Sequence, residues 1–288
     1  MIRALARTAA RALPSRVRAS LARWRFGHDD AGPRIRIERQ HNGTCVHYTI
    51  DGALTFAAVG EAVGAVEYHF VEDGDSRAEM VSFMAVSSAA PADALLLDVG
   101  AHIGLFSIVH LARGPAHRAV LFEPSTPLSS GSTEWLRLNH MTDRAETRCA
   151  GIGNTIQTRA IETDVLGFAV AARDATSGTA VPFTTIDHVC CTEGLRPAII
   201  KIDVEGYEAE VLEGARETLQ RERPVLCLEL HLDMLEQRGR PLATLLGALD
   251  AAGYLFETTD GRPVSTAQLR RSLKAVLRVT ARPGGRRA

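Results

Sequence analysis

The chain has 288 residues, 45% hydrophobic and only 5% aromatic, which suits one large α/β domain with an appendage and a mostly aliphatic core. A net charge of −1 hides basic ends, because residues 1–28 hold seven arginines and no acid, and seven more basic residues follow from Arg270 onward. The middle therefore carries 19 basic against 34 acidic residues, a net charge of −15, which argues against nucleic acid as a partner. Five cysteines without a C-x-x-C pair predict neither a zinc site nor a disulfide framework and indicate the reducing cytoplasm.

Residues 1–28 place apolar side chains every three or four positions among the arginines, as an amphipathic helix does. No run reaches the ~20 apolar residues of a bilayer-spanning helix, and there is no apolar signal-peptide core. Peripheral attachment to an anionic membrane, where a lipid-linked substrate would be met, is one interpretation. A helix packed on the domain or a disordered arm is the interpretation we favour, and an organellar transit peptide has a similar composition.

Residues 34–56 alternate polar and apolar side chains around two turn signals, Asn42-Gly43 and Asp51-Gly52, so they predict a small antiparallel sheet. Residues 60–88 are typical of helix with a break at Asp73-Gly74. The predicted domains are a basic helix and β-hairpin appendage over 1–75, a main domain over 76–280 and a basic tail over 281–288.

The sequence LLLDVGAHIGLFS at residues 95–107 is typical of a buried strand, a glycine turn and a helix. Gly100 and Gly104 leave backbone bare for a ligand at the helix N-terminus. A dinucleotide site has G-x-G-x-x-G, whereas D-x-G-x-x-x-G here puts Asp98 at the strand end, where it repels phosphate and attracts a cation. S-adenosylmethionine (SAM) has no phosphate and carries an ammonium and a sulfonium.

Residues 119–122 predict the next strand, which ends at Glu123, placed to accept hydrogen bonds from the two hydroxyls of a ribose. Asp98 could instead be a turn aspartate, and Glu123 a solvated strand end. Because the two acids come in order at the spacing of a β-α-β unit, we favour a nucleoside site.

A helix over residues 127–141 and a third strand over 145–151 follow. Gly153-Asn154 lies where an adenine ring could be contacted, although an ordinary turn explains it equally well. Residues 155–180, rich in Thr, Ala and Gly, predict a hairpin or loop inserted over the site.

Residues 198–202 and 224–230 predict two more buried strands, followed by the pairs Asp203/Glu205 and Glu229/His231. In a doubly wound sheet, ligands bind beyond the carboxyl ends of the strands, so these pairs should share one crevice with Asp98 and Glu123. A helix over 242–252 and strands over 254–257 and 273–279 complete the prediction.

The chain resembles the FkbM family of SAM-dependent methyltransferases over about residues 76–280. The resemblance rests on an ordered set of motifs: LLLDVGAHIG, FEP at 122–124, Asn139, VPFTTID at 181–187, IKIDVEGYE at 200–208 and LELH at 228–231. It implies a class I SAM-methyltransferase (Rossmann-like) α/β fold, with a mostly parallel seven-stranded sheet, one strand antiparallel, and helices on both faces. Methyl transfer to an oxygen of a sugar, polyketide, glycolipid or similar metabolite is the implied activity.

By this resemblance, Asp98 and Gly100 belong to the methionine end of a SAM site and Glu123 to its ribose, and Gly104 is a further cofactor-binding residue of the turn. His102 stands where the family more often has asparagine, so its side chain could alter the methionine contact. An acceptor hydroxyl must lose a proton, and His231 and Asp203 are the candidate bases, with Glu205 and Glu229 next.

One variant is that Asp203, Glu205 and Glu229 hold a divalent ion that acidifies a substrate diol, an alternative that we do not favour. Another is that Asp203 and Glu205 only stabilise the following helix N-terminus, with Lys201 paired to one of them. Two functions compete with methyl transfer: an NAD(P)-dependent oxidoreductase, which the glycine pattern disfavours, and a non-catalytic binding protein of the same fold.

Overall fold

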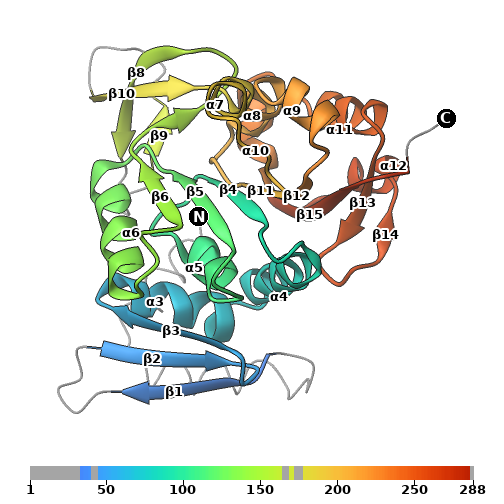
Figure 1. Ribbon diagram of the computed structural model, residues 1–288. Coiled ribbons are helices and arrows are strands. Elements are labelled where there is room, and N and C mark those ends of the chain that lie inside the picture. The colour runs from blue at the N-terminus through green and yellow to red at the C-terminus, as the bar shows by residue number, and fades with distance from the viewer. Residues whose placement is uncertain (1–32, 40–44, 164–168, 172–177, 286–288) are drawn as a thin grey trace, which may run out of the picture. The chain divides into compact units, whose positions relative to one another are not determined.

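The computed structural model describes residues 33–39, 45–163, 169–171 and 178–285 (Figure 1). The chain divides into two compact units at Val81/Ser82. The predicted basic segment over 1–28 and the Asn42-Gly43 turn lie outside the described residues. Among the described helices, none is long and apolar enough to cross a membrane.

The N-terminal unit contains the predicted antiparallel sheet. Its strands are β1 (Ile35–Arg39), β2 (Cys45–Ile50) and β3 (Leu54–Val59), in the order β1-β2-β3. The predicted turn between β2 and β3 is confirmed, because Asp51 and Gly52 both have positive φ (51° and 71°), which a tight hairpin needs. Helix α3 (Glu61–Glu67), π-helix η1 (Tyr68–Glu72) and helix α4 (Gly74–Ala89) follow, and α4 crosses the unit boundary.

A large sheet forms the centre of the second unit, with the strand order β14-β13-β15-β12-β11-β4-β5-β6. Its strands are β4 (Leu95–Val99), β5 (Arg118–Phe122), β6 (Ala145–Arg148), β11 (Ile199–Ile202), β12 (Val225–His231), β13 (Tyr254–Thr258), β14 (Pro263–Val264) and β15 (Val276–Pro283). Strands β6, β5, β4, β11 and β12 run parallel, whereas β15 is antiparallel to both its neighbours. The predicted seven-stranded sheet is confirmed, with the two-residue β14 added at its edge.

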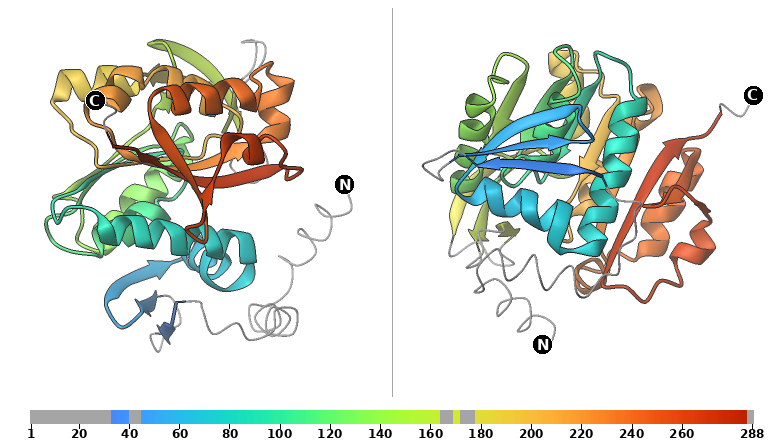
Figure 2. Two further views of the ribbon diagram at one scale, coloured as in Figure 1. Left: turned by 90° about the vertical axis from the view of Figure 1, so that its right-hand side faces the viewer. Right: turned by 90° about the horizontal axis from the view of Figure 1, so that it is seen from below.

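Helices lie on both sides of this sheet (Figure 2). They are α5 (Leu105–Leu111), α6 (Thr126–Leu138), α7 (Ile186–Glu193), α8 (Glu208–Glu213), α9 (Arg216–Arg221), α10 (Leu232–Gln237), α11 (Leu242–Ala251) and α12 (Thr266–Leu269). Leu97, Ile200 and Leu228 pack in one buried cluster with residues of α7 to α12. Each such fully buried side chain stabilises the fold by about 1.5–3 kcal/mol. Because side chains alternate along a strand, Asp98 and Lys201 point to the opposite face, which α5 covers.

A second, smaller sheet has the order β7-β10-β8-β9 and contains β7 (Gly151–Ile152), β8 (Gln157–Thr163), β9 (Ala169–Ala171) and β10 (Thr179–Thr184). The predicted inserted hairpin is confirmed by the antiparallel pairing of β8 with β10. Two of the predicted strands have other bounds in the structure. The segment predicted as one strand over 145–151 forms two, β6 and β7, which belong to different sheets. The last strand, predicted over 273–279, runs over Val276–Pro283, so residues 281–283 belong to the large sheet.

Candidate functional site

A pocket with about 740 Å³ of empty space, part of it open to solvent, lies beyond the carboxyl ends of β4, β5 and β11. Strand β4 is followed along the chain by β5 on one side, whereas β11 on its other side comes much later. Such a reversal of strand order is where α/β sheets bind ligands.

The glycine turn after β4 forms one wall of this pocket. Gly100 has φ of 79°, and a Cβ atom there would lie 1.8 Å from the backbone oxygen of Asp203, so no other residue fits. Gly104, at φ of 88°, begins α5. His102 also has a positive φ, 52°, and lines the pocket. The turn thus brings bare backbone against the ligand space.

Glu123 lines the same pocket and is only 5% exposed. Its carboxylate accepts the backbone N–H of His102 at 2.9 Å and that of Ser125 at 2.8 Å. Burial raises the pKa of Glu123 to about 7, although these two hydrogen bonds oppose the rise. The carboxylate is therefore held in place, at the end of β5, where the sequence predicts ribose binding.

Asp98 does not line the pocket. Its side chain is buried on the α5 side of the sheet, where it accepts a hydrogen bond from Ser107 at 2.7 Å and lies beside Lys201 of β11. Burial raises the pKa of Asp98 and outweighs the nearby charge of Lys201 and the Ser107 hydrogen bond, which both lower it. The prediction that Asp98 shares a cavity with Glu123 was therefore wrong. Glu123 lines the pocket, whereas the alternation of side chains along β4 turns Asp98 to the opposite face of the sheet.

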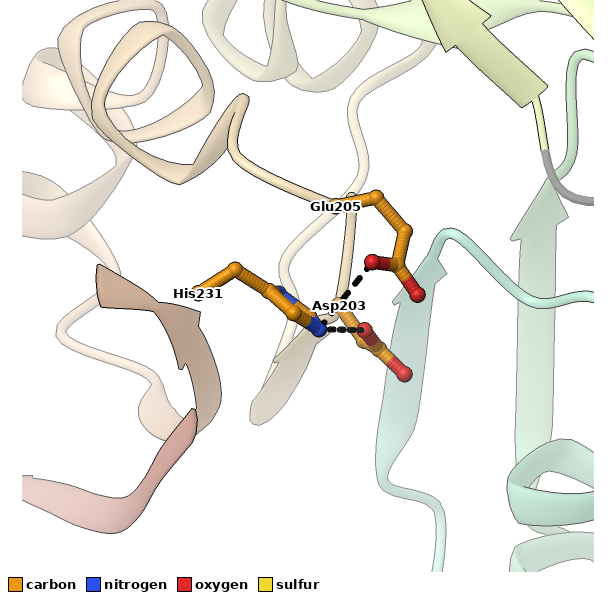
Figure 3. A group of neighbouring side chains, drawn as sticks. All are labelled: Asp203, Glu205 and His231. Atoms are coloured by element: carbon orange, nitrogen blue, oxygen red, sulfur yellow. Dashed lines mark ion pairs between the residues drawn. The ribbon is translucent and has the colours of Figure 1, made fainter. Parts of the chain in front are cut away.

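Three of the predicted chemical groups come together at the other wall (Figure 3). His231 Nε2 lies 3.2 Å from Glu205 Oε2 and 4.0 Å from Asp203 Oδ1, and both acids line the pocket. One atom of each residue lies within 4.8 Å of the others, close enough to share a metal ion. Buried Lys201 donates to Asp203 Oδ2 at 3.1 Å.

These contacts set the charges of the group. Burial alone would raise the pKa of Asp203, but Lys201 and His231 hold it below its usual value. Burial alone would lower the pKa of His231, but a hydrogen bond to Glu208 and the charges of Glu205 and Asp203 raise it. These contacts therefore favour the ionised form of Asp203 and the protonated form of the His231 imidazole.

Glu208 is a residue that the sequence interpretation missed. It is the first residue of α8, fully buried, and its Oε1 lies 2.8 Å from His231 Nδ1. The motif DVEGYE contains it, five residues after Asp203, but the acids of a helix N-terminus are commonly explained by the helix dipole. Only the position of β12 beside β11 shows that Glu208 meets His231.

Glu229 and the Gly153-Asn154 pair stand apart from the pocket wall. The carboxylate of Glu229 pairs with Arg278, its cross-strand neighbour on β15, so the structure does not bring it into the predicted divalent-ion group. Asn154 is exposed and donates to Glu213 at 2.8 Å. Gly151 and Ile152, just before it, line the pocket instead.

The apolar part of the pocket comes from the inserted sheet and the β11 to α8 loop. Ile161, Phe183 and Tyr207 line it and form a small buried cluster with Val181. The guanidinium of Arg159 lies over the Phe183 and Tyr207 rings, at 5.7 and 5.2 Å from their centroids. Phe183 and Tyr207 occur in motifs that the sequence shows, but no role was predicted for them.

Known proteins resemble parts of the chain. The family model described as "Methyltransferase FkbM domain" matches residues 98–256, more than half of the chain. Over 38 residues the chain is 55% identical to the AMB antimetabolite synthetase AmbE of Pseudomonas aeruginosa, which is 13% of this chain and 2% of that protein.

Solved structures also resemble the chain. Methyltransferase FkbM from Methylobacillus flagellatus KT has 17% identity and a TM-score of 0.44, over 66% of this chain and 44% of that one. Precorrin-6y C5,15-methyltransferase from Geobacter metallireducens GS-15 has 15% identity and a TM-score of 0.40, over 75% and 90%. The chain thus spans a small part of the curated relative and less than half of the first of these structures.

Proposed function

The chain belongs to the family of methyltransferases with the FkbM domain, and from this premise we propose that it transfers the methyl group of SAM to a hydroxyl oxygen. The acceptor that we propose is a small molecule or glycolipid: a sugar, a polyketide or a related metabolite. Peripheral membrane contact through the basic segment 1–28 remains a separate proposal about how a lipid-linked acceptor is reached.

The pocket has carboxylates at both ends of its polar wall, and this arrangement supports the proposal. Glu123 stands at the tip of β5, Asp203 and Glu205 stand beyond β11, and the bare backbone of Gly100 lies between them. A cationic nucleoside fits these residues, because the acids offer hydrogen-bond acceptors and negative charge. A pyrophosphate does not, because Glu123 takes up the backbone N–H of His102 that a phosphate would need.

SAM, when bound, supplies an electrophilic methyl group on a sulfonium, which leaves as a neutral thioether. The residues of the chain then have two tasks. Gly100 and Glu123 hold the nucleoside and fix where the methyl group lies, which supplies much of the rate by proximity. Asp203, Glu205 and His231 face the acceptor side, where a hydroxyl must lose its proton.

The first experiment measures binding of SAM and S-adenosylhomocysteine to the full chain by calorimetry. We expect micromolar affinity for both and no binding of NAD. Binding of NAD in place of SAM would overturn the proposal in favour of an oxidoreductase.

The acceptor can be found by incubating the protein with isotopically labelled SAM and a metabolite extract, followed by mass spectrometry. We expect a label on an oxygen of a hydroxylated metabolite. A label on nitrogen or carbon would reject O-methylation, and no labelled product from any extract, with SAM still bound, would favour a non-catalytic binding protein. The variant Glu205→Gln is a useful comparison, because it alters the acceptor side and leaves Glu123 in place.

A further inference from the structure

Glu208 holds one side of the His231 ring. Its carboxylate is fully buried at the start of α8, and Oε1 accepts the backbone N–H of Gly206 at 3.0 Å and contacts His231 Nδ1 at 2.8 Å. An ionised Glu208 carboxylate only accepts hydrogen bonds, so its contact favours the tautomer with a proton on Nδ1 of His231. The Gly206 N–H in turn holds the Glu208 carboxylate in place.

The other ring nitrogen, Nε2, faces the pocket wall. Its neighbours are the carboxylates of Glu205 and Asp203, which line the pocket (Figure 3). A neutral imidazole with its proton on Nδ1 has its lone pair on Nε2, directed toward the Asp203 and Glu205 carboxylates that line the pocket. This chain from a buried carboxylate through histidine to the reacting group is the general way in which a histidine base is oriented.

We propose that Glu208 is a positioning residue that keeps the His231 proton on Nδ1, so that Nε2 takes the proton of the hydroxyl being methylated. The inference rests on the proposed function. As the acceptor oxygen forms its bond to the methyl carbon, the carbon–sulfur bond breaks with its electron pair left on sulfur. The hydroxyl proton passes to Nε2 and then to solvent.

The charges around His231 determine when Nε2 is able to accept a proton. Asp203 and Glu205 face the ring from the loop after β11, and Glu208 faces it from α8. Lys201 of β11 and Arg278 of β15 act on Asp203. These three carboxylates raise the pKa of His231 and favour its protonated form. A cationic methyl donor beside Asp203 and Glu205 offsets their charge and favours the neutral ring, whereas the uncharged thioether product does not.

The test is nitrogen-15 NMR of the histidine side chains in the full-length protein, with the His231 signals assigned by their loss in His231→Asn. We expect the neutral ring to carry its proton on Nδ1. The pKa of His231 should be lower in the SAM complex than in the S-adenosylhomocysteine complex, two ligands that differ by one methyl group and one charge. A proton on Nε2, or equal pKa values in the two complexes, would overturn the inference.

The variant Glu208→Gln keeps the shape of the side chain and removes its charge. We expect the pKa of His231 to fall by about 1 unit, with the fold checked by circular dichroism. An unchanged pKa would contradict the role of Glu208. The matched control is Glu229→Gln, two residues before His231 on β12, whose carboxylate pairs with Arg278; it should change the His231 pKa much less.

Two further measurements separate the possible failures. Calorimetric SAM binding tests the proposed function, so a protein that binds SAM but keeps its His231 proton on Nε2 rejects only the Glu208 inference.

Addition of stoichiometric Mn²⁺ should leave the His231 NMR signals sharp. Selective broadening of these signals would overturn the inference, because Nε2 would then be a metal ligand. If Glu208→Gln fails to fold, the tautomer and the two complexes of the wild-type protein still decide the question.

Discussion

The two polar ends of the pocket use the same chemical group, a carboxyl, with its pKa shifted in opposite directions. Glu123 at the β5 end is held by backbone N–H groups, and burial raises its pKa to about 7. Asp203 at the β11 end lies against Lys201 and His231, whose charges hold its pKa below the usual range. The partners of a carboxylate, rather than its position at a strand tip, therefore set its pKa. The Glu123 end suits hydroxyl groups that donate hydrogen bonds, and the Asp203 end suits a cation and a proton transfer.

The Gly100 backbone joins the two ends, so its replacement should have the largest effect. We expect Gly100→Ala to destabilise the protein by about 4 kcal/mol or more, because its Cβ would overlap the Asp203 carbonyl and its φ is positive. Urea unfolding measures this. The control is Gly64→Ala in α3, where a Cβ meets nothing within 4 Å; equal losses in both variants would contradict the close approach.

The charge of Lys201 favours the ionised forms of Asp203 after β11 and of Asp98 on β4. We expect Lys201→Met to lower the free energy of unfolding by about 3 kcal/mol at pH 7, because Asp98 and Asp203 lose a buried positive charge. The loss should shrink at acid pH, where these carboxylates take up protons. Lys274→Met, at an exposed position, serves as the control and should change stability by less than about 0.5 kcal/mol.

At the opposite end, Glu123→Gln should weaken SAM binding by about 1.5–3 kcal/mol if hydrogen bonds from ribose to a charged acceptor are lost. Calorimetry with SAM and S-adenosylhomocysteine should give the same loss for both, since they share the ribose. The control Glu134→Gln alters an exposed ion pair of α6 and should leave both affinities unchanged. An unaltered affinity of Glu123→Gln would remove the ribose assignment.

The pH dependence of binding tests the same carboxylate with the smallest expected effect. Because ribose hydroxyls donate to the ionised form and the free pKa is about 7, SAM affinity should fall as the pH drops below 7. At pH 6 the binding should be weaker than its alkaline limit by up to about tenfold from this group. In Glu123→Gln this part of the profile should become flat. A wild-type profile that is equally flat between pH 6 and 8 would show that Glu123 is already ionised.

Much of the fold could be predicted from local signals. Apolar runs bounded by Gly, Asp and Glu indicated β4, β5, β11 and β12 in the right order, because strands buried on both faces leave such runs in the sequence. The split between β6 and β7 was not predictable, since one short segment contributes to two sheets. Strand β6 pairs with β5, whereas β7 pairs with β10, some 30 residues later, where the Phe183 ring packs over Gly151.

In the candidate site, too, some features could be predicted from local sequence and others depend on residues far apart in the chain. The order of residues along the chain is enough to show which acids follow which strands, and that a glycine turn without a pyrophosphate pattern lies among them. The folded chain is needed to show that Asp98 turns to Lys201, that Glu229 pairs with Arg278 and that Glu208 meets His231. Each of these contacts joins residues from different elements, so it depends on strand order and register, which no local pattern contains.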